Sequence, residues 1–107
     1  IKEVFTMNIN NDNIKQEVFE SDIPVILDFY SDKCMPCRII APVLDHLEKK
    51  HCNKLKVCKL DVTKHSELAD KYGVMAVPTL MYVKDGKELN RTIGLVDSAE
   101  ILKNLEL

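Results

Sequence analysis

The sequence lacks the features that would mark a nucleic-acid-binding or membrane-spanning chain. Among its 107 residues, lysine and arginine (15) do not outnumber aspartate and glutamate (17), and the net charge is -2. There is no basic stripe interleaved with aromatic residues, and tryptophan is absent altogether. The apolar runs are far shorter than the roughly 20 residues that a membrane-spanning helix needs. We therefore expect a soluble protein with neither a nucleic-acid partner nor a membrane partner.

Cysteine is also scarce. Four cysteines are too few for a disulfide scaffold, and their uneven clustering suits a reducing compartment with one working pair. The cytoplasm is therefore the expected location. No signal-peptide pattern is present, although the chain begins at Ile1 rather than at a methionine, which leaves export open. With 46% hydrophobic residues and no repeat or linker, residues 1–107 are expected to form a single domain.

Apolar spacing and turn residues predict an α/β chain with the order βαβαβαββα. The expected strands cover 2–7, 24–30, 55–61, 79–83 and 87–93. The expected helices cover about 11–22, 34–50, 63–73 and 97 onward. Strand–helix–strand order implies a parallel crossover, whereas the tight turn Asp85-Gly86 makes the last two strands antiparallel. The prediction is a central mixed five-stranded sheet flanked by four helices.

Polar residues mark the expected helix ends. Residues 11–13 offer cap oxygens to the first helix, and Thr63 offers one to the third, which should stop at Gly73. Asp97, followed by Glu100, resembles a capping box that opens the last helix. In the second helix the apolar positions, which are Ile39/Ile40, Val43/Leu44 and Leu47, recur every three to four residues.

Two cysteines lie where the second strand passes into the second helix, in the segment Cys34-Met35-Pro36-Cys37. At a helix N-terminus, unpaired backbone N–H groups and the helix dipole favour a thiolate on Cys34. Lys33 and Arg38 add positive charge nearby. Cys37 follows one helical turn later, close enough for a disulfide. We interpret the pair as a two-electron redox site with Cys34 as the nucleophile.

A C-x-x-C segment is also half of a zinc site, which is the alternative interpretation. The remaining cysteines, Cys52 and Cys58, are too widely spaced to form a second such pair. Cys58 lies in a strand pattern, where a small buried hydrophobe is its ordinary role. We therefore expect no metal and an inert Cys52.

With Cys34-Met35-Pro36-Cys37 after a strand and Val77-Pro78-Thr79 before the hairpin, the sequence resembles the thioredoxin family over essentially the whole chain. A lone C-x-x-C would be weak evidence for this family. Together with a proline about 40 residues downstream, at the start of a strand, it is specific to the fold. Further points of likeness are Asp28-Phe29, Pro42, Lys59, Lys71-Tyr72-Gly73-Val74, Asp85-Gly86 and Gly94. The usual Trp-Cys-Gly-Pro-Cys is changed, because Lys33 replaces the tryptophan and Met35 the glycine. Tyr30 stands where another tryptophan is common.

Asp28 is an anomaly in an apolar strand, since a carboxylate among Ile26, Leu27 and Phe29 is costly to bury ionised. One interpretation is a structural ion pair with Lys59. The other, which the resemblance supports, is that Asp28 lies behind Cys37 and takes its proton when a mixed disulfide resolves. Both can hold together. The expected catalytic set is Cys34, Cys37, Asp28 and Lys59.

The resemblance also implies a target-binding groove. Pro78 and Gly94 have ordinary explanations, as a strand-start proline and a strand-end glycine. In the family the bond before the matching proline is cis and its neighbouring backbone pairs with the target, and the matching glycine leaves room for a partner. The expected substrate-binding residues are Lys33, Met35, Pro36, Met75, Ala76, Val77, Pro78 and Gly94.

The favoured function is reduction of protein disulfides through a Cys34–Cys37 dithiol–disulfide cycle. The resemblance implies a thioredoxin reductase as electron donor, disulfide-containing proteins as targets, no bound cofactor and a monomer. A dithiol oxidase or isomerase is the first alternative, because Lys33 and Met35 alter the motif. A non-catalytic docking module is the second, and the intact cysteine pair with Asp28 and Pro78 argues against it.

Overall fold

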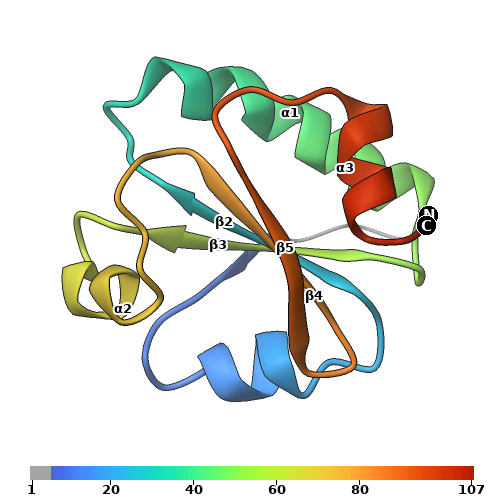
Figure 1. Cartoon of the computed structure of the whole chain (residues 1–107), viewed down its shortest axis with the longest axis horizontal. Helices are drawn as coiled ribbons and strands as arrows, with labels where there is room; N and C mark the ends of the chain where they lie inside the picture. Colours follow the sequence, from blue (N-terminus) through green and yellow to red (C-terminus); the bar gives the residue numbers. More distant parts are fainter. Residues whose placement is uncertain (1–5) are drawn as a thin grey trace.

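The computed structural model describes residues 6–107, which form a central sheet with helices on both faces (Figure 1). The strands are β1 (Met7–Asn8), β2 (Val25–Tyr30), β3 (Lys56–Asp61), β4 (Thr79–Lys84) and β5 (Lys87–Ile93). The helices are the single π-helical turn η1 (Lys15–Phe19) and the α-helices α1 (Met35–Lys50), α2 (Ser66–Lys71) and α3 (Ser98–Asn104). The predicted order βαβαβαββα is confirmed.

The five strands lie in the order β1-β3-β2-β4-β5. β1 and β2 run parallel to β3, whereas β4 runs antiparallel to β2 and β5. The sheet is therefore mixed, as predicted, with β2 at its centre. Between β4 and β5, Asp85 and Gly86 have φ angles of 52° and 78°. Two successive positive φ angles are typical of the tight turn that matches the twist of a hairpin.

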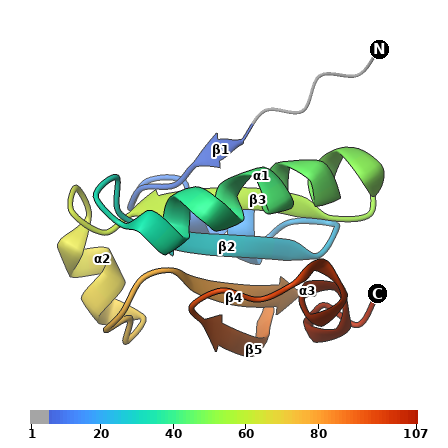
Figure 2. The same cartoon turned by 90° about the horizontal axis from the view of Figure 1, so that it is seen from above.

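The core has two layers, one on each face of the sheet. Figure 2 looks onto one of these faces, where α1 lies across β2 and β3. Because successive strand side chains point to opposite faces, alternate residues of β2 enter different layers. One layer joins Ile26, Leu80 and Tyr82 of the sheet to Ile40, Leu44 and Leu47 of α1 and to Ile101 and Leu105 of α3. The other joins Leu27, Phe29, Leu60 and Met81 to Val18 of η1 and to Leu68 and Ala69 of α2. Strand alternation places Asp28 on the same face as Ile26, under α1.

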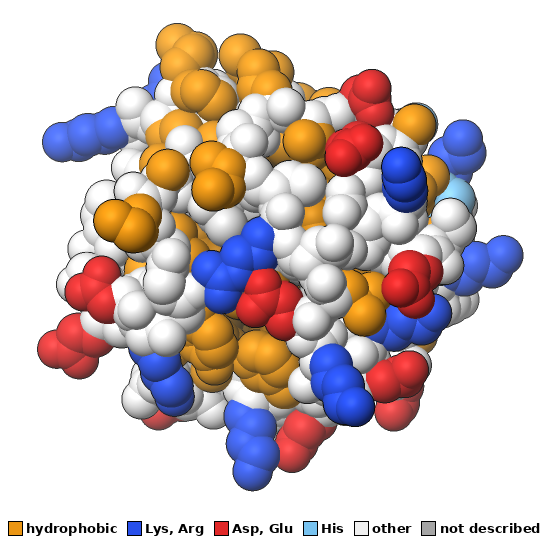
Figure 3. Space-filling model, viewed as in Figure 1, with side chains coloured by type: hydrophobic (Ala, Val, Ile, Leu, Met, Phe, Trp, Pro, Cys, Tyr) orange, Lys and Arg blue, Asp and Glu red, His pale blue; other side chains and the backbone are white. Residues whose placement is uncertain are grey.

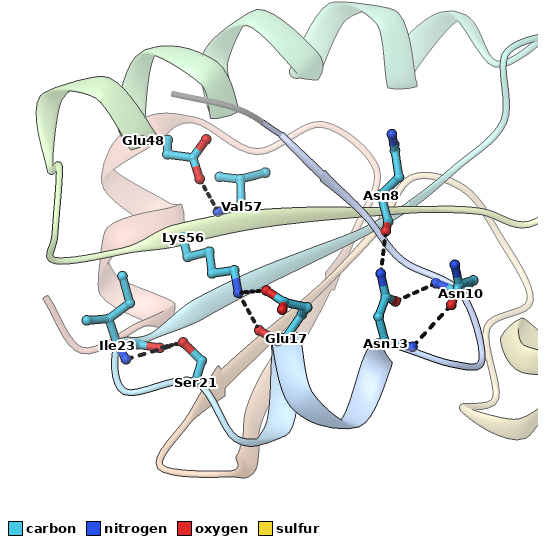
Figure 4. Close-up of polar contacts among 9 residues, drawn as sticks. All are labelled: Asn8, Asn10, Asn13, Glu17, Ser21, Ile23, Glu48, Lys56 and Val57. Carbon is cyan, nitrogen blue, oxygen red and sulfur yellow. Dashed lines mark hydrogen bonds and ion pairs between the residues drawn. The ribbon is translucent and has the colours of Figure 1, made fainter. Parts of the chain in front are cut away.

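The beginning of the chain differs from the prediction. Residues 2–5 of the expected first strand lie outside the described residues, and β1 is the short strand Met7–Asn8. The expected helix over 11–22 is reduced to η1. Asn10 and Asn13 supply the turn oxygens, because Asn10 Oδ1 accepts the Asp12 and Asn13 N–H groups at 2.8 and 3.1 Å and Asn13 Oδ1 accepts the Asn10 N–H at 2.8 Å. Figure 4 shows the two bonds between Asn10 and Asn13. These bonds satisfy N–H groups that have no partner in the first turn of a helix.

The predicted cap of α2 is also wrong. The Thr63 N–H and hydroxyl donate to Oδ1 of Asp61 at 2.9 and 2.6 Å, and α2 begins only at Ser66. Its end follows the prediction, because Gly73 takes a φ of 68° just after the helix. Asp97 does cap α3, with its Oδ1 accepting the Glu100 N–H at 2.9 Å.

Two acidic side chains bind helices to β3 (Figure 4). Lys56 Nζ donates to the Glu17 carboxylate at 2.7 Å and to the Glu17 carbonyl at 2.8 Å, which fastens η1. From α1, the buried Glu48 carboxylate accepts the Val57 N–H at 2.6 Å. Burial raises the pKa of Glu48, and the Val57 hydrogen bond opposes that rise. These polar contacts hold η1 and α1 on opposite faces of the sheet.

Candidate active site

The end of β2 and the start of α1 position the two cysteines. A short loop leads from Tyr30 to Cys34, whose N–H donates to the Ser31 carbonyl at 3.1 Å. Cys34 is the N-cap of α1, and its Sγ accepts the Cys37 N–H at 3.2 Å. Pro36 occupies the first turn, where a missing N–H removes no helical hydrogen bond. The helix N-terminus thus donates directly to the Cys34 sulfur, as the sequence predicts.

Cys34 and Cys37 form a disulfide, with their Cα atoms 5.2 Å apart. The two sulfurs differ in access. Cys37 is buried, with 4% of its surface exposed, whereas Cys34 is partly exposed. Thiol–disulfide exchange requires a thiolate to reach the sulfur that it attacks. An external disulfide can therefore meet Cys34, while Cys37 is confined to reaction with its neighbour.

A pocket of about 270 Å³ lies against the buried cysteine. It is lined by Asp28, Tyr30, Ser31 and Asp32 at the end of β2, by Lys59 of β3, and by Cys37, Arg38 and Ala41 of α1. Three of the four residues predicted to take part in the chemistry, Cys37, Asp28 and Lys59, meet in this pocket. Cys34 adjoins it through the disulfide.

Asp28 is buried, with 1% of its surface exposed, and its Oδ1 has no hydrogen-bond partner among the described residues. Burial raises the pKa of this carboxyl from 3.8 to about 7. The charge of Lys59 opposes the rise and that of Asp45 adds to it. A carboxyl with a pKa near neutrality can both accept and return a proton.

The ion pair between Asp28 and Lys59, one of the two interpretations of Asp28, is not formed. The two residues are Cα partners in the register of β2 and β3. Lys59 Nζ lies instead over the Tyr30 ring, 5.7 Å from its centroid. Among the described residues, the ion pairs do not include Asp28. Lys59 therefore acts on Asp28 through its charge, and Asp28 Oδ1 has no hydrogen-bond partner among the described residues.

The residues predicted to bind a target surround Cys34 and the Val77–Pro78 bond, which is cis. Lys33, Met35, Pro36, Met75 and Ala76 are exposed, Val77 and Gly94 are half-buried and Pro78 is buried. The Gly94 N–H donates to the Pro78 carbonyl at 2.9 Å, which joins the end of β5 to this segment. Hydrophobic side chains gather over the start of α1 and the segment leading into β4, on the upper left of Figure 3.

Three exposed hydrophobic residues were not predicted as surface: Ile39 (52%), Ile93 (69%) and Leu95 (55%). Of the apolar pair Ile39/Ile40, Ile40 takes the core position and Ile39 is exposed. Two consecutive residues on a helix point about 100° apart, so a narrow apolar stripe accommodates only one of them. The signal for Ile93 and Leu95 was their place on either side of Gly94.

The other two cysteines carry free thiols. Cys58 is buried, and burial raises its pKa to about 12, which is the environment of an unreactive thiol. Cys52 is partly exposed at the end of α1. Within residues 6–107, no cluster of three or more His, Cys, Asp and Glu side chains is placed to hold a metal ion. No helix in this range has the length and apolar character needed to cross a membrane.

Comparison with known proteins supports the interpretation of this site. The thioredoxin family model matches residues 5–107. The M-type thioredoxin of the chloroplast of Chlamydomonas reinhardtii is 41% identical over 98 residues, which cover 92% of this chain and 70% of that protein. Thioredoxin 1 of Nostoc sp. is 36% identical over 98 residues, 92% of each chain. The thioredoxin of Pseudomonas aeruginosa is 36% identical over 100 residues, 94% of this chain and 93% of its own. This chain therefore belongs to the thioredoxin family, and its Cys34–Cys37 disulfide is the redox-active group of a thiol–disulfide oxidoreductase.

Proposed function

We propose that Cys34 and Cys37 divide the reduction of a target disulfide between them. The Cys34 thiolate attacks one target sulfur, the target S–S bond breaks, and the other target sulfur leaves as a thiolate. Cys37 then attacks the Cys34 sulfur, which releases the first target sulfur and closes the Cys34–Cys37 disulfide. Two electrons pass to the target. The single observation that carries this assignment is the difference in access between the partly exposed Cys34 and the buried Cys37.

Asp28 accepts the proton of Cys37 in the second step, directly or through water in the shared pocket. Its position beside Cys37 and its raised pKa support this role. Lys59 tunes the carboxyl through its charge.

An extended target segment pairs with the backbone beside Val77 and Pro78, in the manner of strand addition to a sheet edge. Lys33, Met35, Pro36, Met75, Ala76 and Gly94 form the surrounding surface. The exposure of Met35 (63%) and Met75 (97%) supports this assignment, because flexible methionine side chains adapt to varied apolar surfaces.

The chain works as a single domain over residues 1–107 and as a monomer, without an added cofactor. A thioredoxin reductase returns electrons to it, and disulfide-containing proteins receive them, in the cytoplasm. Membership of the thioredoxin family supports the donor and the class of target.

A redox titration tests the proposal. The protein is equilibrated in dithiothreitol buffers, and free thiols are counted on each cysteine by alkylation and mass spectrometry, since no tryptophan serves as a probe. A two-electron transition confined to Cys34 and Cys37, at or below roughly -230 mV, is expected for a reductase. A midpoint of roughly -180 to -120 mV would favour a dithiol oxidase or isomerase instead. No transition would contradict the redox function and favour a docking module.

A further inference from the structure

Lys59 has two partners within reach on the face of the sheet under α1. In the register of β2 and β3 it is the Cα partner of Asp28, and Tyr30 follows two residues later on the same face. Its Nζ lies 5.7 Å from the Tyr30 ring centroid, within the range of a cation–π contact. Asp28 Oδ1, by contrast, has no hydrogen-bond partner among the described residues. The ammonium thus lies with the ring and not with the carboxyl.

We propose that Tyr30 is a positioning residue, whose ring holds the Lys59 ammonium away from Asp28 and so keeps the buried carboxyl available as the proton acceptor for Cys37. This inference rests on the role proposed above for Asp28. It assigns to Tyr30 a function that depends on its aromatic face and not on its hydroxyl.

The alternative position of Lys59 would weaken Asp28 as a base. A direct ammonium–carboxylate pair stabilises the ionised form and lowers the pKa of the carboxyl. It would also occupy oxygen lone pairs that must receive the proton. Because desolvation offsets much of the attraction in a buried ion pair, a cation–π contact is strong enough to compete for the ammonium.

The other charged groups around the pocket do not replace Lys59. From α1, Asp45 raises the pKa of Asp28, and the Arg38 guanidinium donates from Nε and Nη2 to the Asp32 carbonyl at 3.1 and 2.8 Å. From β4, the residue paired with Asp28 is the apolar Leu80. Cys37, from α1, is the proton donor itself. Burial is the largest influence on the pKa of Asp28, and Lys59 is the cation that opposes it.

The Tyr30 hydroxyl stays neutral over the pH range of the proposed step. Burial raises its pKa, and the charges of Asp61, Asp32 and Asp28 add to the rise. The ring thus keeps its neutral cation-binding face while Asp28 titrates. Phenylalanine should serve in its place.

The test compares Tyr30→Leu, which removes the ring, with the matched control Tyr30→Phe, which keeps it. Two quantities are measured on the reduced protein: the Asp28 pKa by carboxyl ¹³C NMR, and the pH profile of target release from the Cys34 mixed disulfide. In Tyr30→Leu we expect the Asp28 pKa to fall toward its ordinary value and release at pH 7 to slow about tenfold. In Tyr30→Phe both should remain as in the parent protein.

Further variants distinguish a failure of the role inferred for Tyr30 from a failure of the role proposed for Asp28. In a Lys59→Met background, Tyr30→Leu should no longer lower the Asp28 pKa, because the ammonium it positions is gone. An unchanged Asp28 pKa in Tyr30→Leu, or an equal fall in Tyr30→Phe or in the Lys59→Met background, would overturn the inference. Should Tyr30→Leu fail to fold, Tyr30→Met makes the same comparison. Parent-like release by Asp28→Asn would instead refute the proposed role of Asp28, and the NMR titration would still report where Lys59 lies.

Discussion

The Asp28 carboxyl and the Cys37 sulfur line one pocket from two different elements, the central strand β2 and the helix α1. Both residues are buried, with 1% and 4% of their surfaces exposed. A proton passing between them need not enter bulk solvent. A volume of about 270 Å³ leaves room for water to relay it. The helix that carries Cys34 at its N-terminus therefore also places Cys37 in the pocket of Asp28, the proposed base.

Replacing the base should slow the second step of the reaction. For Asp28→Asn we expect target release from the Cys34 mixed disulfide at pH 7 to be about 100-fold slower, since general-base catalysis typically contributes 10²- to 10⁴-fold. The inflection near pH 7 should disappear from the release profile. Quenched-flow alkylation of the released thiol measures both. Asp32→Asn, at an exposed carboxylate of the same pocket, is the control and should keep the inflection.

The same substitution should stabilise the protein at high pH. The folded-state pKa of Asp28 is about 7 against an ordinary 3.8, so between these values the folded state holds a proton that the unfolded state has lost. The stability from Asp28 is therefore complete below about pH 4 and is lost as the pH rises through about 7. At about 1.4 kcal/mol per pKa unit, Asp28→Asn should raise the free energy of unfolding by about 2 to 4 kcal/mol at pH 8. Denaturant titrations should show little gain at pH 4, and equal gains at both pH values would contradict the assignment.

The two free thiols should differ sharply in reactivity. Cys52 was expected from the sequence to be inert, but its partial exposure now favours reaction with iodoacetamide at pH 8 in the oxidised protein, whereas Cys58 should react only after unfolding. Burial keeps the reagent from reaching Cys58 and disfavours the thiolate, which is the reactive form of the thiol. Peptide mass spectrometry with and without denaturant measures this. Rapid native modification of Cys58 would show that β3 opens far more readily than its packing implies.

Alanine substitutions at two glycines with positive φ should destabilise the protein to different extents. Gly86 and Gly94 have φ angles of 78° and 86°, so alanine is strained at both. A Cβ at Gly86 would lie 3.0 Å from the Phe19 carbonyl oxygen, whereas at Gly94 it would meet nothing within 4 Å. We expect Gly94→Ala to cost about 1 kcal/mol and Gly86→Ala about 2 kcal/mol or more, measured by denaturant unfolding. A larger loss at Gly94 would contradict the order set by the contact.

The elements with strong local signals were predicted closely. β5 follows its prediction residue for residue, and α1 begins one residue after the expected start, because turn residues and an apolar stripe mark them in the sequence. The errors lie where two local solutions compete. Side-chain oxygens of Asn10 and Asn13 fix the turn before η1, and Thr63 bonds to Asp61 in place of capping α2. The outcome at such positions depends on which neighbouring polar side chain forms the hydrogen bond with the backbone N–H group.

The sequence by itself determined the order of elements, the place of Cys34 and Cys37 at a helix N-terminus and the presence of a carboxyl in the central strand. These follow from spacing along the chain. Only the tertiary structure decided that Cys37 is buried beside Asp28, and that Lys59 lies over Tyr30 and does not form an ion pair with Asp28. The physical reason is that strand register, burial and desolvation determine which partner a long flexible side chain contacts. These are properties of the packed sheet and not of the local sequence.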